Sequence, residues 1–451
     1  MYCIDKSPES QQEFRRSVQS PLLSELLTDA EIEIVCKELG HVWRDRQLPP
    51  GATLRSMVYR GLHPDKTISH VVDHLAAHGE VSPSLTGSAW CQARSRLPEA
   101  VCHEMIVRSA DRLRDLAGGR GLWCGRPVFR IDGSTLSMPD EPDLVEAFGY
   151  APGKHGPSRF PVARITFIVL AGAEAVWDYR LDEYRRSEEA QLHDMWRRLP
   201  EESIALFDRK FGSFYNLAKL QQHRVDVVCP LHQRRDPKKL IRHGKKLGPN
   251  EWLVTLKLAP QLRKKYDDPS LPQELKVRLI RVRRNHGREK EDLWLVTTLR
   301  DRRRYRRRKV AALYRDRWPV ETRIGSVKTT LKLAVLRSKT EPNARREVAA
   351  ALLGHNLVWT LMHQAAQQTH TPAERISFAR TIGVLQEYVA PLRYCRPDQR
   401  QKIYQQMLER IASHINPYRP DRVEPRKIKR DSTRYPHMRK PRQEARKECL
   451  S

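Results

Sequence analysis

The chain has 451 residues, 39% of them hydrophobic, which is enough for about two to four domains with real cores. Its 83 Lys and Arg against 54 Asp and Glu give a net charge of +29, which favours a polyanionic partner. Nucleic acid is the first candidate, and a membrane surface or ribosomal RNA is the alternative. The longest apolar run, 165–177, is too short to cross a bilayer, the first residues lack an apolar signal core, and the eight cysteines form no C-x2-C pair. We therefore expect a cytoplasmic protein with reduced thiols and no membrane partner.

The amino-terminal third has helical patterning, and we predict an all-α domain over residues 1–118. A capping box starts it, because Thr28 precedes Glu31 by three residues ahead of an apolar run. Further helices are predicted at 69–78, 88–96 and 99–116. Arginines cluster late in this region and suit DNA binding, whereas a purely structural collar is the alternative, since no recognition-helix signature is present. These arginines are Arg94, Arg96, Arg108, Arg112 and Arg114.

Two short apolar strands that each end in an aspartate mark the next region, 119–229. Residues 127–132 end at Asp132 before a glycine, and residues 203–208 end at Asp208. Carboxylates at the carboxyl ends of strands lie where α/β folds keep their chemistry. Between and after these strands, the patterns predict a hairpin, two helices and a further strand, which together imply a mixed or parallel sheet with helices on its faces. The hairpin is expected at 161–172 and 175–182, the helices at 188–198 and 213–223, and the last strand at 225–229.

Residues 230–300 are predicted to form a β-rich insertion, because the stretch between Asp208 and Glu321 is longer than a single connection requires. Strands rich in Val, Leu, Ile and Trp are predicted at 251–259, 275–284 and 292–300. Two basic runs, 234–246 and 300–309, are candidates to line a DNA channel, and solvated loops are the alternative.

Residues 313–339 carry a helical pattern with a polar and an apolar face. In a helix, Tyr314, Arg317, Glu321 and Lys328 would fall within an arc of about 60°. Pro319 would kink this helix or start a new one, so a common face for all four does not follow automatically. A solvated amphipathic helix is the alternative. The apolar stripe on the adjoining face consists of Leu313, Val320, Ile324, Val327 and Leu331.

The carboxyl-terminal part is helical and then basic. Residues 347–367 are apolar at helical spacing, and His355 among them is interpreted as a packing residue rather than a ligand. Further helices are predicted within 371–415. The segment 416–451 is rich in Pro, Arg and Lys and is predicted to be a disordered basic tail.

The spacing Y-x2-R-x3-E-x6-K, filled by Tyr314, Arg317, Glu321 and Lys328, resembles the signature of bacterial insertion-sequence DDE transposases of the insertion-element-four family. The segments GSTLSMPD (133–140), LRSKT (336–340) and LLGHNLV (352–358) also resemble that family. The resemblance implies an α/β fold with an RNase H-like catalytic core, a mixed five-stranded sheet with flanking helices. The core would come in two parts, 119–229 and 301–370, interrupted by the insertion. Lys210 stands where the family carries glycine, and it would be strained there if that position needs a positive φ.

The resemblance also implies an activity and a site. Asp132, Asp208 and Glu321 would hold two Mg2+ ions, which Mn2+ can replace. Tyr314, Arg317 and Lys328 would hold DNA phosphates, and Trp318 and Trp294 would stack on a displaced base, with ordinary core packing as their alternative.

The implied reaction is nicking at the ends of an element, followed by attack of the freed 3′-OH on target DNA. The implied partners are terminal inverted repeats, target DNA and a second copy of the chain in a synaptic complex at the bacterial nucleoid. Two other functions stay open on the sequence: a metal-dependent nuclease of the same fold, and a non-catalytic DNA-binding descendant.

Overall fold

The fold is built on one mixed β-sheet. The computed structural model describes residues 26–44, 47–77, 81–153, 156–286, 289–315 and 330–417, without the side chains of 284–291. The described strands form a ten-stranded sheet in the order β4-β3-β2-β5-β6-β10-β9-β8-β7, with β1 paired to β2. The strands are β1 (Leu122–Trp123), β2 (Arg126–Ser137), β3 (Val162–Leu170), β4 (Ala175–Glu183), β5 (Ile204–Phe207), β6 (Asp226–Pro230), β7 (Lys245–Gly248), β8 (Glu251–Lys257), β9 (Glu274–His286) and β10 (Glu289–Thr297).

The strands predicted around the two aspartates are all present. β2 pairs antiparallel with β3, and β3 pairs antiparallel with β4, which is the predicted hairpin. β5 lies parallel to both β2 and β6. β2 runs beyond the predicted end at Asp132, because its pairing with β3 continues as far as Ser137.

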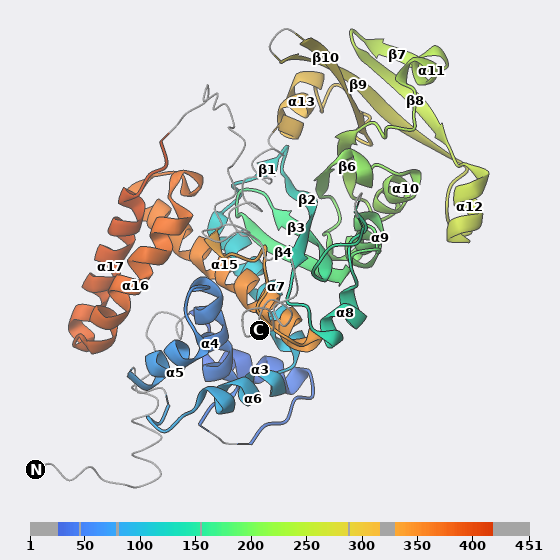
Figure 1. The fold of residues 1–451 in the computed structure, drawn as a ribbon. Coiled ribbons are helices and arrows are strands. Elements are labelled where there is room, and N and C mark those ends of the chain that lie inside the picture. Colours follow the sequence, from blue (N-terminus) through green and yellow to red (C-terminus); the bar gives the residue numbers. More distant parts are fainter. Residues whose placement is uncertain are drawn as a thin grey trace, which may run out of the picture. The chain divides into compact units, whose positions relative to one another are not determined.

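The insertion does not form a sheet of its own. β10 pairs antiparallel with β6, with Leu295 opposite Pro230 and Val296 opposite Cys229, so β7–β10 extend the sheet from β6 (Figure 1). The part of the sheet that comes from residues 126–230 has five main strands, β4-β3-β2-β5-β6, as predicted for the core, and the strands of the insertion continue it. The physical reason is that β6 is apolar and would otherwise present an open edge, which the apolar residues of β10 cover by pairing.

Most predicted helices are present, but α4 was not individually predicted, and neither were three shorter helices. α8, α11 and α12 each begin with a proline in the first turn, a helix-start signal that was not used. The helices are α3 (Asp29–Glu38), α4 (Pro50–Leu62), α5 (Ile68–Ala77), α6 (Gly87–Arg96), α7 (Glu99–Ala117), α8 (Pro142–Phe148), α9 (Glu188–Met195), α10 (Phe214–Gln222), α11 (Pro237–Arg242), α12 (Pro260–Tyr266), α13 (Arg307–Arg315), α15 (Glu341–Thr369), α16 (Phe378–Tyr394) and α17 (Pro397–Ser413). None of the described helices is long and apolar enough to span a membrane.

α15 joins the amino-terminal helices to the sheet. It packs against α7, α4, α17 and β4 (Figure 1). The Asn356 side chain accepts from the Val176 N–H at 2.8 Å and donates to the Val176 carbonyl at 3.0 Å, so it occupies the edge of β4 as a strand would. His355 is buried, with Nε2 3.0 Å from the Glu174 carbonyl, which confirms its interpretation as a packing residue.

The chain divides into two compact units, Met1–Ile415 and Asn416–Ser451. The domain boundaries that the sequence predicts within the first unit stay predictions.

The helix predicted over 313–339 is wrong at its carboxyl-terminal end. Helix α13 starts earlier, at Arg307, while residues 331–337 are not helical and include a parallel bridge from Val335 to Ser137. The Ser137 N–H donates to the Ala334 carbonyl at 2.9 Å, and the Leu336 N–H donates to the Ser137 carbonyl at 2.8 Å. Backbone groups of β2 beyond the end of β5 thus find partners in this segment. Leu331 is buried, but it does not belong to a helical stripe.

Candidate active site

Asp132 and Asp208 take neighbouring positions where the parallel pairing of β2 and β5 ends. The last residues that β2 and β5 pair are Ile131 and Phe207, and the next residue is Asp132 within β2 and Asp208 just after β5. Neighbouring strands are about 4.8 Å apart. Two residues far apart in the sequence therefore occupy neighbouring backbone positions in the sheet.

Both carboxylates project from the sheet face that α13 covers. Val128 of β2, together with Ile204 and Leu206 of β5, packs in one apolar cluster with Val310 and Leu313 of α13. Side chains alternate between faces along a strand, so Asp132 shares the face of Val128, and Asp208 shares that of Leu206. The helix that precedes the predicted glutamate in sequence thus covers the face that carries both aspartates.

Each aspartate is held by a backbone N–H close to it in sequence. Asp132 Oδ1 accepts from the Gly133 N–H at 2.9 Å. Asp208 Oδ1 accepts from the Lys210 N–H at 3.0 Å and caps a 3-10 turn over Arg209–Phe211. Lys210 does not have a positive φ, so the strain considered for a side chain at this position is absent. Since the turn is right-handed, glycine is not required there.

The buried thiol of Cys229 on β6 lies close to Asp208. Burial, and after it the negative charge of Asp208, raise the pKa of this thiol. Without a bound metal, Cys229 is therefore protonated at neutral pH.

A carboxylate that the sequence reading did not single out lies behind the aspartate pair. Glu188, at the start of α9, packs against Gly133, where an added Cβ would come within 2.4 Å of the Glu188 carboxyl carbon. Gly133 faces away from the Asp132 side, so Glu188 is on the opposite face of the sheet. Arg164 forms an ion pair with Glu188 at 3.0 Å and supplies its countercharge. The sequence signal was the Ser187 cap, which places Glu188 in the first turn.

Two aromatic residues predicted to contact DNA lie in the described part of the chain. Tyr314 has only 5% of its surface exposed, because its ring packs in the apolar cluster between α13 and the sheet. Trp294 is half-buried on β10, with its ring 5.7 Å from that of Trp252 and the Arg281 guanidinium 5.7 Å above it. The Trp294 carbonyl accepts from the Leu231 N–H at 2.7 Å, just beyond the end of β6.

The other predicted site residues, Arg317, Trp318, Glu321 and Lys328, lie outside the described residues. Within the described ranges, no group of three or more His, Cys, Asp or Glu side chains is arranged to hold a metal ion. Of the predicted carboxylates, the structure thus brings Asp132 and Asp208 together.

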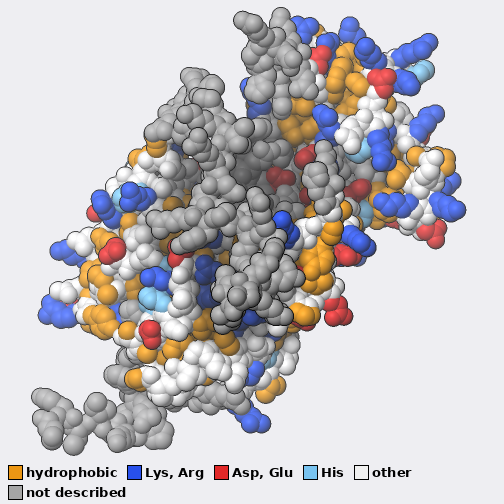
Figure 2. Space-filling view, in the orientation of Figure 1, with side chains coloured by type: hydrophobic (Ala, Val, Ile, Leu, Met, Phe, Trp, Pro, Cys, Tyr) orange, Lys and Arg blue, Asp and Glu red, His pale blue; other side chains and the backbone are white. Residues whose placement is uncertain are grey.

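The two basic runs are exposed and belong to the β7–β10 end of the sheet. Figure 2 shows Lys and Arg side chains gathered over this region. A groove beside Pro249 and Glu251 is lined by the second run. Its basic residues are Arg302, Arg303, Arg306, Arg307, Arg308 and Lys309. Exposed basic residues of the first run and of α12 are Arg234, Lys238, Lys239, Arg242, Lys245, Lys246, Arg263, Lys264 and Lys265.

An aspartate pair at the carboxyl edge of an α/β sheet, accompanied by a strongly basic surface, fits an enzyme that acts on nucleic-acid phosphodiesters. Residues 123–357 match the family described as the transposase DDE domain. This match spans more than half of the sequence, and the chain belongs to this family, as a bacterial insertion-sequence transposase that cleaves DNA and transfers its strands. The resemblance read from the sequence is thereby confirmed.

Relatives in Escherichia coli (strain K12) agree with this assignment. The chain is 25% identical to the transposase InsG for insertion sequence element IS4 over 434 residues, 93% of this chain and 95% of the relative. It is 32% identical to the putative transposase InsZ over 154 residues, 33% of this chain and 50% of that relative.

Among solved structures, a piggyBac transposase synaptic complex with hairpin DNA matches 89% of this chain and 87% of its own, at 12% identity and a TM-score of 0.40. That likeness is too weak to support an argument about the fold.

Proposed function

We propose that Asp132, Asp208 and Glu321 together form the cleavage site of this transposase, in an RNase H-like core. The observation that supports this most is the parallel register of β2 and β5, in which the positions of Asp132 and Asp208 are neighbours. The hairpin β3–β4 and the parallel strands β5 and β6 follow β2 in the order that an RNase H-like core requires. Glu321 follows α13 in sequence, and α13 covers the face from which both aspartates project.

The donor set fits hard divalent cations. Carboxylate oxygens are preferred ligands of Mg2+ and Mn2+, and neighbouring carboxylates repel each other unless a cation offsets their charge. When bound, two Mg2+ ions would stabilise the charge that develops at the scissile phosphate and its leaving oxygen. The chain itself orients the ligands, because the N–H groups of Gly133 and Lys210 fix one oxygen of each aspartate.

The substrate would be double-stranded DNA at the ends of the element and at its target. Arg317 and Lys328 would bind phosphates near the scissile bond, while the groove of Arg302–Lys309 would hold the duplex by charge. Tyr314 would reach a phosphate with its hydroxyl alone, since its ring is buried. Trp294 and Trp318 remain candidates for stacking on a displaced base, and the active form would be a homodimer in the synaptic complex.

Neutralising single carboxylates tests the site. Asp132→Asn and Glu321→Gln should each reduce Mg2+-dependent nicking of end DNA by more than about 100-fold, because a metal ligand is lost. DNA binding measured in Ca2+ by gel shift should persist or tighten, since a negative charge is removed from a basic surface. Glu188→Gln is the matched control on the opposite face and should still nick. Nicking at the parental rate by Asp132→Asn, or its loss in Glu188→Gln, would contradict the assignment.

A strand-transfer assay separates this function from that of a nuclease that cuts without joining. The parent protein should join a pre-cleaved end with a free 3′-OH to a target duplex, and Glu321→Gln should not. Hydrolysis without any joined product would favour the nuclease.

A further inference from the structure

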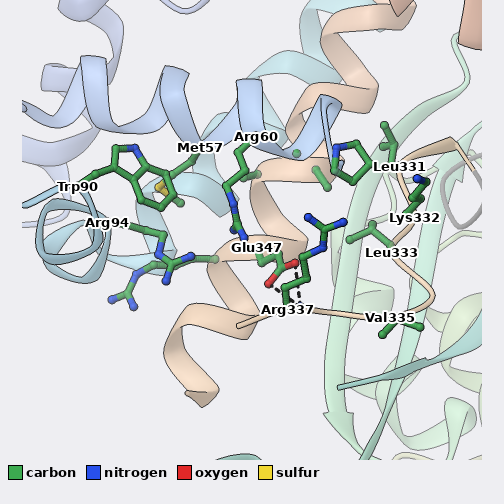
Figure 3. Close-up of a pocket in the computed structure, with 15 residues that line it drawn as sticks. Met57, Arg60, Trp90, Arg94, Leu331, Lys332, Leu333, Val335, Arg337 and Glu347 are labelled. Atoms are coloured by element: carbon green, nitrogen blue, oxygen red, sulfur yellow. Dashed lines mark hydrogen bonds between the residues drawn. The ribbon is translucent and has the colours of Figure 1, made fainter. Parts of the chain in front are cut away.

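A second site is built from arginines and lies between the amino-terminal helices and the rest of the chain. A pocket opens between α4, α6, the start of α15 and the segment 331–337 (Figure 3). Arg60 and Arg94 project into it beside Trp90, across from Arg337 and Glu347. Neither Asp132 nor Asp208 lines this pocket.

Arg94 is a buried cation without a countercharge at bonding distance. Only 8% of its surface is exposed, and its guanidinium stacks 5.1 Å above the fully buried ring of Trp90. Its Nε has no hydrogen-bond partner, and no carboxylate pairs with the guanidinium among the described residues. Burial, followed by the positive charge of Arg60, lowers the pKa of Arg94.

Arg60 repeats this arrangement from the neighbouring helix. Its guanidinium lies 5.8 Å from the centre of the same Trp90 ring, and its buried Nε also lacks a hydrogen-bond partner in the described part of the chain. Two like charges thus share one aromatic surface, an unfavourable arrangement unless an anion joins them.

The carboxylate that lines the pocket is largely occupied by other donors. Glu347 accepts from the N–H groups of Arg337 and Ser338, at 3.1 and 2.9 Å, and from the Ser338 hydroxyl at 2.6 Å. Arg346 adds a further positive charge and donates to the carbonyls of Leu97 and Ser95. The pocket therefore carries a net positive charge, only part of which Glu347 offsets.

We propose that this pocket binds a phosphate group of the element's end DNA between Arg60 and Arg94. A planar guanidinium presents paired N–H donors that match phosphate oxygens, and an anion held here would supply the countercharge that the chain does not. One wall of the pocket comes from α4 and α6, and another from the segment that bridges to Ser137 of β2. A bound phosphate would hold these walls together. The inference rests on the proposed function in taking DNA as the source of the phosphate.

Thermal unfolding in inorganic phosphate and in pyrophosphate tests the pocket directly. Either anion should raise the Tm of the parent protein, because ligands that bind the folded state stabilise it. Arg94→Met should abolish this rise while keeping an apolar chain against Trp90, and Arg60→Met should reduce it. Arg96→Met is the matched control, an exposed arginine of the same helix, and should keep the rise. An equal rise in the parent and in Arg94→Met would overturn the proposal.

DNA binding in Ca2+, which supports binding without cleavage, identifies the source of the phosphate. Arg94→Met should weaken binding to end DNA by about 10-fold, the usual effect of losing a charged hydrogen bond. Loss on both 5′-hydroxyl and 5′-phosphate duplexes indicates a backbone phosphate, and loss on the 5′-phosphate duplex alone indicates a terminal one. Unchanged affinity for both would overturn the DNA assignment and leave free phosphate as the ligand. If the carboxylate site is wrongly assigned, the Glu321→Gln variant should still nick DNA. Phosphate should raise the Tm of that variant in either case, because Arg60 and Arg94, which line the pocket, are unchanged in it.

Discussion

Two buried arginines, Arg278 on β9 and Arg94 on α6, differ in whether a carboxylate of the chain lies beside them. Arg278 is fully buried, with Nε 2.7 Å from a Glu251 carboxylate oxygen. It also donates to the carbonyls of Leu299 and Tyr305, at 3.2 and 2.7 Å. Arg94 is almost as buried. Among the described residues, however, its guanidinium stacks on the Trp90 ring and has no hydrogen-bond acceptor. The chain itself gives the first arginine a countercharge and two carbonyl acceptors, although its Nε and Nη2 make no hydrogen bond within the described ranges, and the second arginine is arranged to receive an anion from outside.

The arginine that is paired with a glutamate, Arg278, supports the candidate active site indirectly. Arg278 holds the turn at Tyr305 that leads into α13, and Arg126 of β2 binds the hydroxyl of the same tyrosine at 3.2 Å. Arg126 also forms an ion pair with Asp226 at 2.6 Å. These bonds fix α13 over the sheet face of Asp132 and Asp208, so Arg278 has a structural role while Arg94 has a binding role.

The largest effect is expected from breaking the paired arginine. Arg278→Met should lower the free energy of unfolding by about 3–5 kcal/mol, because it leaves Glu251 buried without its cation and two carbonyls without a donor. Urea unfolding followed by circular dichroism measures this. The matched control is Arg281→Met, three residues along β9, whose pair with Asp292 is partly exposed and should matter far less. Equal losses would contradict the structural role of the buried pair.

Replacing both Arg278 and Glu251 tests whether the cost of the single variant comes from the unpaired charge. Arg278→Met combined with Glu251→Met should recover part of the loss, on the order of 1–2 kcal/mol, because no uncompensated buried charge remains. Recovery should be incomplete, since the carbonyls of Leu299 and Tyr305 still lack their donor. A double variant less stable than Arg278→Met would show that Glu251 contributes through packing rather than through its charge.

The smallest effect is expected at the unpaired arginine. In phosphate-free buffer, Arg94→Met should leave the free energy of unfolding unchanged or raise it by about 1 kcal/mol, because a buried charge without a partner is costly. Urea unfolding again gives the answer, with Arg96→Met as the exposed control. A loss comparable to that of Arg278→Met would mean that Arg94 holds the fold together, and the contrast between the two arginines would fail.

Much of the candidate site could be read from short-range patterns. The apolar runs before Asp132 and Asp208 are typical of buried strands, and both strands form where predicted. The hairpin and α9 also follow from local periodicity, since each pattern repeats within a few residues. The predicted helix over 313–339 extended too far at its carboxyl-terminal end. Periodicity alone cannot reveal that backbone groups within 331–337 form hydrogen bonds with Ser137 of β2.

The sequence by itself determined that Asp132 and Asp208 follow apolar strand segments and, through the Y-R-E-K spacing, the family to which the chain belongs. Tertiary structure alone decided that β10 would close the edge of β6 and that Glu188 would lie behind Gly133. It also decided which arginine would meet a glutamate: Arg278 on β9 pairs with Glu251 on the neighbouring strand β8, whereas Arg94 and Arg60 both lie over the Trp90 ring. The physical reason is the difference in sequence separation between the residues that interact. Hydrophobic periodicity and capping act within a few residues, whereas strand pairing and charge compensation depend on segments that only the fold brings together.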